Sequence, residues 1–322
     1  MTLISSPASA GGAAAQATVE RLLKSGKADL AGRIFHVALV ATLATSILIL
    51  GVLLVDMVST ARPVLTGRLG EFLDGSMRSQ AGTSGIRQGL VGTFWIGVFV
   101  VVLAFPLGIA AAIHLEEYAS GSRLTRFIDV NIRNLAGVPS VVYGILGLTI
   151  FVKALGSVTG EAQANGRTIL SAGLTLAVLV LPIVIISAAE ALRAVPDGLR
   201  EAGFGVGATR WEVVRHHVLP YAAPGILTGT VLALARALGE AAPLILVGAT
   251  TGYLTSGNEF FDLGALRERF AAMPILIATW SGRPGRDWEQ VTAAAIVMLL
   301  VMVLAANTFA ILLRNRFEKK RG

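Results

Sequence analysis

The chain has 322 residues, of which 54% are hydrophobic and only 15% charged, and its formal net charge is +7. Together with a mean hydropathy of +0.71, this composition is typical of a protein that crosses a membrane several times, and it excludes an ordinary soluble domain. The absence of cysteine excludes disulfides, thiol catalysis and cysteine-ligated metals.

Six stretches are apolar and long enough to cross a hydrocarbon core about 30 Å thick, which predicts an all-α, polytopic membrane helix bundle. The expected spans lie near residues 36–58, 88–114, 134–153, 168–192, 224–249 and 290–313. Before them, residues 1–35 are rich in alanine, glycine and serine and are expected to form a partly disordered tail. The first apolar stretch is too long for a cleavable signal peptide, so we expect an uncleaved anchor.

Basic residues set the expected orientation. If both termini lie inside, the inner segments hold more Lys and Arg than the outer ones, and the basic tail at residues 314–322 directly follows the last span. Positive charge is concentrated on the cytoplasmic side of membrane proteins. Both termini are therefore predicted to be cytoplasmic.

Three connectors between the spans are long enough to have structure of their own. Residues 59–87 are polar and are predicted to form an outer loop, and residues 115–132 an inner connector with two adjacent glutamates. The longest connector, residues 250–289, has an apolar middle at residues 270–280 that is too short and too broken by proline to span. We expect an interfacial segment or partial plug on the outer face.

The third predicted span is interrupted by backbone-breaking residues. Gly137 and Pro139 should open its hydrogen-bond ladder, and the hydroxyl groups of Ser140 and Tyr143 follow directly. Open backbone at membrane depth is tolerated only where protein or water satisfies the freed groups. A kinked packing helix is the alternative interpretation.

A polar stretch at residues 193–221 separates the fourth and fifth predicted spans. Gly207 should divide it into two short helices, Thr209 can cap the second with Glu212 completing a capping box, and Pro220 is expected to end it. Two exposed helices, too short and too polar to span, have a suitable shape for docking into a groove on a partner. An ordinary connector between spans is the alternative.

The fifth predicted span carries two opposite charges. Arg236 and Glu240 are four residues apart and should share one helix face. Charges at membrane depth are costly and usually face a bundle interior or a polar path. The pair is either a structural ion pair or a gate for an oxyanion, whose oxygens match the planar guanidinium. Arg133 and Arg193, at the ends of neighbouring spans, are weaker candidates for the same path.

No Walker A motif occurs in the sequence, so we expect this chain to bind no nucleotide and to catalyse no reaction. The four histidines lie near predicted membrane boundaries without a metal-binding pattern, so no metal site is expected. Any ATP-driven process would require a separate ATPase chain.

From about residue 85 to its end, the chain resembles the permease subunits of phosphate ABC importers, which have the MetI-like fold. Residues 135–144, the 193–221 loop and residues 225–246 carry the resemblance, and residues 241–248 are more similar to the PstA type than to the PstC type. The loop matches the ATPase-coupling motif of that family at Glu201, Ala202, Gly203, Gly207, Leu219 and Pro220. Gly203 replaces the usual second Ala of the motif, and we expect the two to be equivalent because any small residue suits the bend.

The resemblance implies a MetI-like permease domain at residues 88–313 in the cytoplasmic (inner) membrane. It implies four partners for the chain: a second permease of the PstC type, a homodimeric ATPase of the PstB type that binds ATP-Mg, an extracytoplasmic phosphate-binding protein of the PstS type, and phosphate itself. It also implies translocation roles for Arg236 and Glu240. The open alternatives are a permease for molybdate, sulfate or phosphonate, the PstC-type subunit, an ion-coupled secondary transporter, and a membrane scaffold or signalling subunit.

Overall fold

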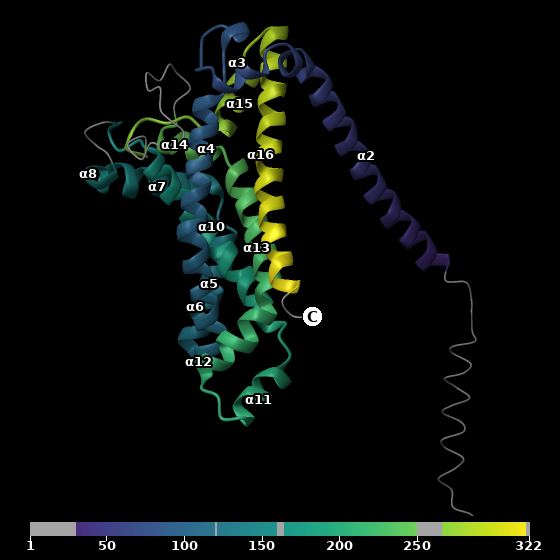
Figure 1. Cartoon of the computed structure of the whole chain (residues 1–322), viewed down its shortest axis with the longest axis vertical. Coiled ribbons are helices and arrows are strands. Elements are labelled where there is room, and N and C mark those ends of the chain that lie inside the picture. Colours follow the sequence, from purple (N-terminus) through teal and green to yellow (C-terminus); the bar gives the residue numbers. More distant parts are fainter. Residues whose placement is uncertain (1–29, 120, 160–163, 250–265, 320–322) are drawn as a thin grey trace, which may run out of the picture. The chain divides into compact units, whose positions relative to one another are not determined.

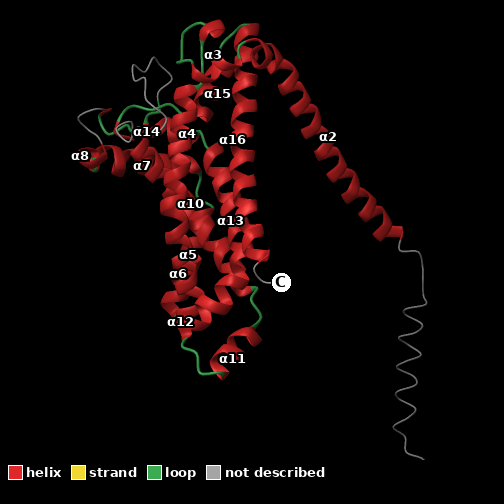
Figure 2. Cartoon of the chain, in the orientation of Figure 1, coloured by secondary structure: helices red, strands yellow, loops and turns green. Residues whose placement is uncertain are grey.

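The computed structural model describes residues 30–119, 121–159, 164–249 and 266–319, and every regular element in these ranges is a helix (Figure 2). The all-α prediction is thus confirmed. The chain divides into two units, residues 1–56 and 57–322. The described part of the first unit is the beginning of α2 (Leu30–Gly67), which is apolar on all sides and contains the predicted first span, 36–58.

Among the described residues, five helices are long and apolar enough to cross a membrane, and a sixth span is possible if a bent helix pair counts as one. The five are Gly32–Gly67, Arg87–Tyr118, Ile169–Arg193, Arg210–Gly239 and Arg286–Leu312. The predicted span 88–114 lies within the second of these helices, 168–192 matches the third to within one residue at each end, and 290–313 lies within α16 (Arg286–Lys319).

Two of the long helices contain a wide π-helical turn just before a proline. Helix Arg87–Tyr118 consists of α4 (Arg87–Phe99), η2 (Val100–Ala104), α5 (Phe105–Ile113) and η3 (His114–Tyr118), and its η2 turn precedes Pro106. A proline has no N–H and clashes with the carbonyl four residues earlier, and a π-turn gives the chain room at that point. The proline therefore stays within a continuous helix.

A π-turn before Pro220 likewise makes the prediction that this proline ends a helix wrong. Pro220 does not end a helix, because α12 (Arg210–Val213), η5 (Val214–Val218) and α13 (Leu219–Gly239) run on without a break. The N–H of Leu219 donates to the carbonyl of Val214, five residues earlier, so the helix widens directly before the proline.

The third predicted span, 134–153, is also corrected. The chain forms α6 (Arg123–Ala136), then a break, then α7 (Ser140–Gly147) continued by η4 (Leu148–Ala154), and the two parts are bent by 99°. The predicted connector 115–132 is therefore mostly helical. The bend follows from Pro139, which cannot continue the hydrogen-bond ladder of α6. A short helix, α8 (Gly156–Thr159), follows.

The fifth predicted span, 224–249, is divided as well. Helix α13 ends at Gly239, and the short α14 (Ala242–Val247) begins after a break at Glu240 and Ala241. In an unbroken helix, the ring of Pro243 would meet the carbonyl of Gly239, and glycine is itself a weak helix former.

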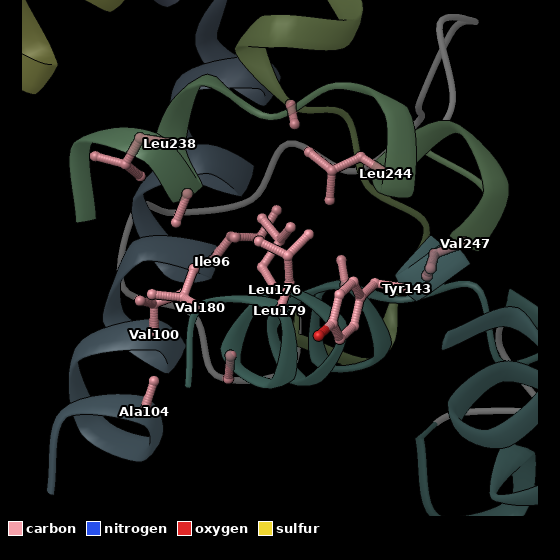
Figure 3. Packing of buried hydrophobic residues seen from close by; sticks show 14 of the residues in the cluster. Ile96, Val100, Ala104, Tyr143, Leu176, Leu179, Val180, Leu238, Leu244 and Val247 are labelled. Atoms are coloured by element: carbon pink, nitrogen blue, oxygen red, sulfur yellow. The ribbon is translucent and has the colours of Figure 1, made fainter. Parts of the chain in front are cut away.

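The most buried helix of the second unit is α10 (Ile169–Arg193), which packs against α4, α5, α6, α7, α13 and α14. Its residues Leu176 and Val180 form a core with Ile96 and Val100 of the Arg87–Tyr118 helix and with Leu238 of α13 (Figure 3). This core holds the two broken helices against the central one.

A second core forms at the end of the second unit opposite the 193–221 loop (Figure 1). Phe72 of α3 (Leu69–Asp74) and Ile86 pack there against Met273 and Trp280 of α15 (Met273–Ser281), and the short η1 (Ala81–Thr83) contributes to it. The predicted loop 59–87 is thus folded, and most of the apolar segment 270–280 is buried within the protein. Residues 250–265 lie outside the described residues.

Candidate functional site

The 193–221 loop contains two short helices, as predicted. The first, α11 (Asp197–Gly205), ends in a Schellman motif. The N–H of Gly207 donates to the carbonyl of Phe204 at 2.9 Å, and the N–H of Ala208 donates to that of Gly203 at 3.2 Å. Gly207 has a φ of 83°, a conformation that favours glycine.

The second helix begins with the predicted capping box. The backbone N–H of Thr209 donates to the carboxylate of Glu212 at 2.8 Å, and the N–H of Glu212 donates to the hydroxyl of Thr209 at 3.4 Å. The corner between α11 and α12 is therefore fixed on both sides by local hydrogen bonds.

Gly203 is the point where α11 packs on the second helix, and here the expectation of equivalence with alanine is wrong. A Cβ at this position would lie 2.8 Å from Cγ2 of Val213, which is buried and β-branched. Such a side chain has little rotamer freedom with which to move away. In this packing, alanine at position 203 does not fit unless Val213 or α11 shifts.

The other motif residues divide into exposed and structural ones. Glu201 and Ala202 lie on the exposed face of α11, whereas Leu219 and Pro220 lie in the first turn of α13. Sequence reasoning missed the large apolar side chains beside them. These are Phe204, Val206, which is 83% exposed, and Trp211. An exposed apolar patch of this kind is typical of a docking surface.

Arg133 and Arg193 belong to a cluster of opposite charges next to the loop. Arg193, the last residue of α10, donates two hydrogen bonds to Glu116, at 2.6 and 2.9 Å. Arg133 donates to Asp129 at 3.1 Å and lies 3.8 Å from Glu190. Both arginines therefore have carboxylate partners from the surrounding helices.

The hydroxyl of Tyr143 donates a hydrogen bond to the backbone beside the helix break. Helix α6 ends at Ala136, and the buried Tyr143 of α7 donates from its hydroxyl to the carbonyl of Leu135 at 2.9 Å. That carbonyl also accepts from the backbone N–H of Val138 at 3.1 Å, so Tyr143 adds a second donor at the end of α6. Gly137 and Pro139 lie in the break, and Ser140 begins α7.

The helices that follow the two breaks, α7 and α14, lie against each other, although about one hundred residues separate them in the sequence. Gly144 of α7 is so close to α14 that a Cβ on it would lie 2.7 Å from Cα of Pro243. Tyr143 shares a core with Leu244 and Val247 of α14 (Figure 3). This packing connects the helix after the break at Pro139 with the helix after the break at Glu240 and Ala241.

Arg236 and Glu240 form an ion pair, with Nε of the arginine 3.5 Å from Oε1 of the glutamate. The prediction that they share one helix is wrong, because Glu240 has extended backbone (φ −78°, ψ 119°) just after α13 ends. The Arg236 side chain is 54% exposed, whereas that of Glu240 is mostly covered. The arginine is therefore open to contact by a ligand or a neighbouring chain.

The pair and the charge cluster lie at different heights of the bundle. Gly225 of α13 lies against Ala191, two residues before Arg193, and Arg236 comes eleven residues after Gly225. At 1.5 Å per residue, that is about 16 Å along the helix. Arg133 and Arg193 are thus not brought together with Arg236. Within the described ranges, no group of three His, Asp or Glu side chains could hold a metal ion.

Comparison with known proteins yields one matching family model, that of the binding-protein-dependent transport system inner membrane component, over residues 104–321. The chain is 32% identical over 256 residues to the probable ABC transporter permease protein YqgI of Bacillus subtilis, covering 78% of this chain and 84% of that protein. It is 33% identical over 237 residues to the phosphate transport system permease protein PstA 1 of Mycobacterium tuberculosis, covering 74% and 73%.

Among solved structures, the fold is similar to a chain of a bacterial ABC transporter involved in the import of the acidic polysaccharide alginate. The TM-score is 0.60 at 17% sequence identity, and the match covers 88% of this chain and 96% of that one. At this level of identity, the similarity concerns the fold alone.

Proposed function

The chain belongs to the family of inner membrane components of binding-protein-dependent transport systems, and from this membership we propose that it is a permease subunit of an ATP-driven importer of inorganic phosphate. The observation that carries the proposal is the similarity to a PstA permease at 33% identity over about three quarters of both chains. The fold, which is similar to that of an ABC transporter chain, agrees with this membership.

Arg236 contacts phosphate during its passage in this proposal. Its guanidinium is half-exposed, and its 3.5 Å separation from Glu240 is longer than the 2.7–2.9 Å of a strong charge-assisted hydrogen bond. Exposed ion pairs contribute only about 0–1 kcal/mol. A phosphate that offers two oxygens to the planar guanidinium therefore displaces Glu240, which takes the arginine back afterwards.

The partners follow from the same premise. A second permease of the PstC type completes the path, a PstS-type protein delivers phosphate, and a PstB-type ATPase binds ATP-Mg and docks on the 193–221 loop. The exposed Phe204, Val206 and Trp211 support the docking role, because apolar side chains at a loop tip are suited to burial in a partner's groove. Both termini and the loop are cytoplasmic, and this chain itself hydrolyses nothing.

The sequence indicated Arg133 and Arg193 as weaker candidates for the translocation path, and the proposal does not place them there. Each is paired with carboxylates beside the loop, so neither offers phosphate a vacant guanidinium in the arrangement described. We assign the path to Arg236 and Glu240, and the two other arginines to the inner end of the bundle.

Uptake of radiolabelled phosphate tests this proposal. Cells that lack their own permease receive this chain with its partner subunits, either wild type, as Arg236→Gln, or as the control Arg126→Gln, which removes an exposed arginine of α6. We expect uptake with the wild type and the control, and loss of uptake with Arg236→Gln at equal membrane levels. Normal uptake with Arg236→Gln would refute the assigned path.

Two further arms separate the alternatives. An excess of unlabelled sulfate, molybdate or phosphonate should leave phosphate uptake unchanged, and competition by one of them would reassign the substrate. Omission of the ATPase subunit should abolish uptake. Uptake that persists without the ATPase but stops with an ionophore would indicate an ion-coupled transporter.

A further inference from the structure

Arg200 of α11 makes more polar contacts than any function assigned so far requires. Its Nε and Nη2 donate to the carboxylate of Glu117 at distances of 2.8–3.4 Å. Nη2 also donates to the carbonyl of Leu192 at 2.9 Å, and Nη1 to that of Val195 at 2.8 Å and to Asp197 at 3.0 Å. All three guanidinium nitrogens are thus engaged at once.

These contacts join three elements, one of which is 83 positions away from Arg200 in the sequence. Arg200 belongs to α11, Glu117 to η3 at the end of the Arg87–Tyr118 helix, and Leu192 to the last turn of α10. The side chains of Glu117 and Arg200 are only 8% and 19% exposed. The neighbouring pair, Arg193 and Glu116, also connects the end of α10 with the end of the Arg87–Tyr118 helix.

Burial makes the contact rigid and hard to replace. The hydrogen bonds to Glu117 raise the pKa of the Arg200 guanidinium further above its ordinary value, so it stays charged. Its planar fork holds donors in fixed directions, which a lysine ammonium cannot reproduce. Loss of either partner leaves the other as a mostly buried charge without its partner, and loss of Arg200 also removes the side-chain donor to the carbonyl of Val195.

The other half of the loop is connected differently. Helix α12 runs without a break through η5 into α13, so it moves with the fifth span. Helix α11 has no such continuity with a span, because Val195 and Pro196 separate it from α10. At that end, Arg200 makes the polar contacts of α11 with the bundle, and Leu199 packs beside it on the apolar core that includes Leu192 and Val195.

From this arrangement, and resting on the proposed function, we propose that Arg200 and Glu117 are positioning residues of the coupling step. They transmit a displacement of α11, imposed by the ATPase, to the second and fourth spans, while α12 transmits it to the fifth. The three spans consequently move together when the loop is displaced.

The ratio of phosphate transported to ATP hydrolysed tests the proposal. The complete transporter is reconstituted in proteoliposomes with its binding protein, as wild type, Arg200→Gln, Glu117→Gln, the milder Arg200→Lys, the charge swap Arg200→Glu with Glu117→Arg, and the control Arg126→Gln. Loss of one partner of a mostly buried pair should lower phosphate per ATP about tenfold or more, with ATP hydrolysis still stimulated by the binding protein. The charge swap should not recover this loss, because a carboxylate at position 200 would face Asp197 and the carbonyls of Leu192 and Val195, and the control should match the wild type.

A purely structural role predicts another result. Assembly, ATP hydrolysis and transport would then fall in parallel and the ratio would stay constant, which would overturn the proposal. An unchanged ratio in Arg200→Gln and Glu117→Gln would do the same.

A second measurement does not depend on the substrate. Because the chain lacks cysteine, spin labels can be placed through Gly198→Cys in α11 and His114→Cys in η3, both exposed positions. We expect a narrow distribution of label distances that broadens when Arg200→Gln is added. An unchanged distribution would refute the proposal that Arg200 holds α11 in place. If the wild type transports no phosphate, the proposed function fails, and this distance measurement alone decides whether Arg200 holds α11.

Discussion

Substitution of Gly203 by alanine provides a sharp test of how the 193–221 loop is packed. The new methyl carbon would lie 2.8 Å from Cγ2 of Val213, at least about 0.7 Å closer than the optimum for two carbon atoms. Overpacking of this kind costs about 1–3 kcal/mol. Alanine also favours a helix by about 1 kcal/mol relative to glycine, which offsets part of this cost.

Gly205→Ala removes that offset from the comparison. Gly205 is in the same helix, and a Cβ on it would meet nothing within 4 Å, so this variant gains the propensity without the clash. The difference between the two variants is therefore the packing term, about 1–3 kcal/mol. It corresponds to amide exchange about 5- to 150-fold faster in α11 of Gly203→Ala, measured by hydrogen–deuterium exchange.

Val213→Ala gives the reciprocal check, because it removes both Cγ atoms that the new methyl group would meet. In this background, the effect of Gly203→Ala should be largely lost, as a coupling energy between contacting residues. If α11 of Gly203→Ala exchanges no faster than that of Gly205→Ala, the described packing of α11 on Val213 is wrong.

Three other substitutions have expected outcomes. Gly207→Val should destabilise the loop by about 1–2 kcal/mol or more, since a β-branched residue is forced to a φ of 83°; faster proteolysis at the loop than in wild type would be the sign, and equal rates would contradict it. Tyr143→Phe should lower the stability of the protein in detergent by about 0.5–1.5 kcal/mol, because the carbonyl of Leu135 loses one of its two donors and keeps the N–H of Val138; an unchanged thermal midpoint would contradict this. Trp211→Ala should weaken binding of the ATPase by about 2 kcal/mol, or roughly 30-fold, in a pull-down titration at equal membrane levels; full retention would exclude this side chain from the interface.

The sequence allowed prediction where the cause of a structure is local. Thr209 and Glu212 form their capping box through atoms three residues apart, and Gly207 ends α11 through its own backbone freedom. The break at Pro139 follows from the proline itself. Such features depend little on distant parts of the chain.

The features that were not predicted arise from the local widening of a helix or from contacts between distant segments. Pro220 continues its helix because the preceding turn widens, which the residue type alone does not indicate. Segment 270–280 is buried because Phe72 and Ile86, about two hundred residues earlier, complete its core. Arg200 was not singled out, since its partner Glu117 precedes it by 83 positions.

The π-turn at η5 has a consequence for the rotational phase of the whole fifth span. An α-helix advances by about 100° per residue, so a turn that takes up roughly one additional residue rotates everything on one side of it by about that angle. A helical wheel drawn through residues 210–239 with a uniform repeat consequently assigns the side chains of α12 to the wrong azimuth relative to those of α13. The azimuth at which Trp211 leaves the bundle, relative to Arg236, is thus set by the wide turn before Pro220, and the number of residues between Thr209 and Pro220 is not free to vary.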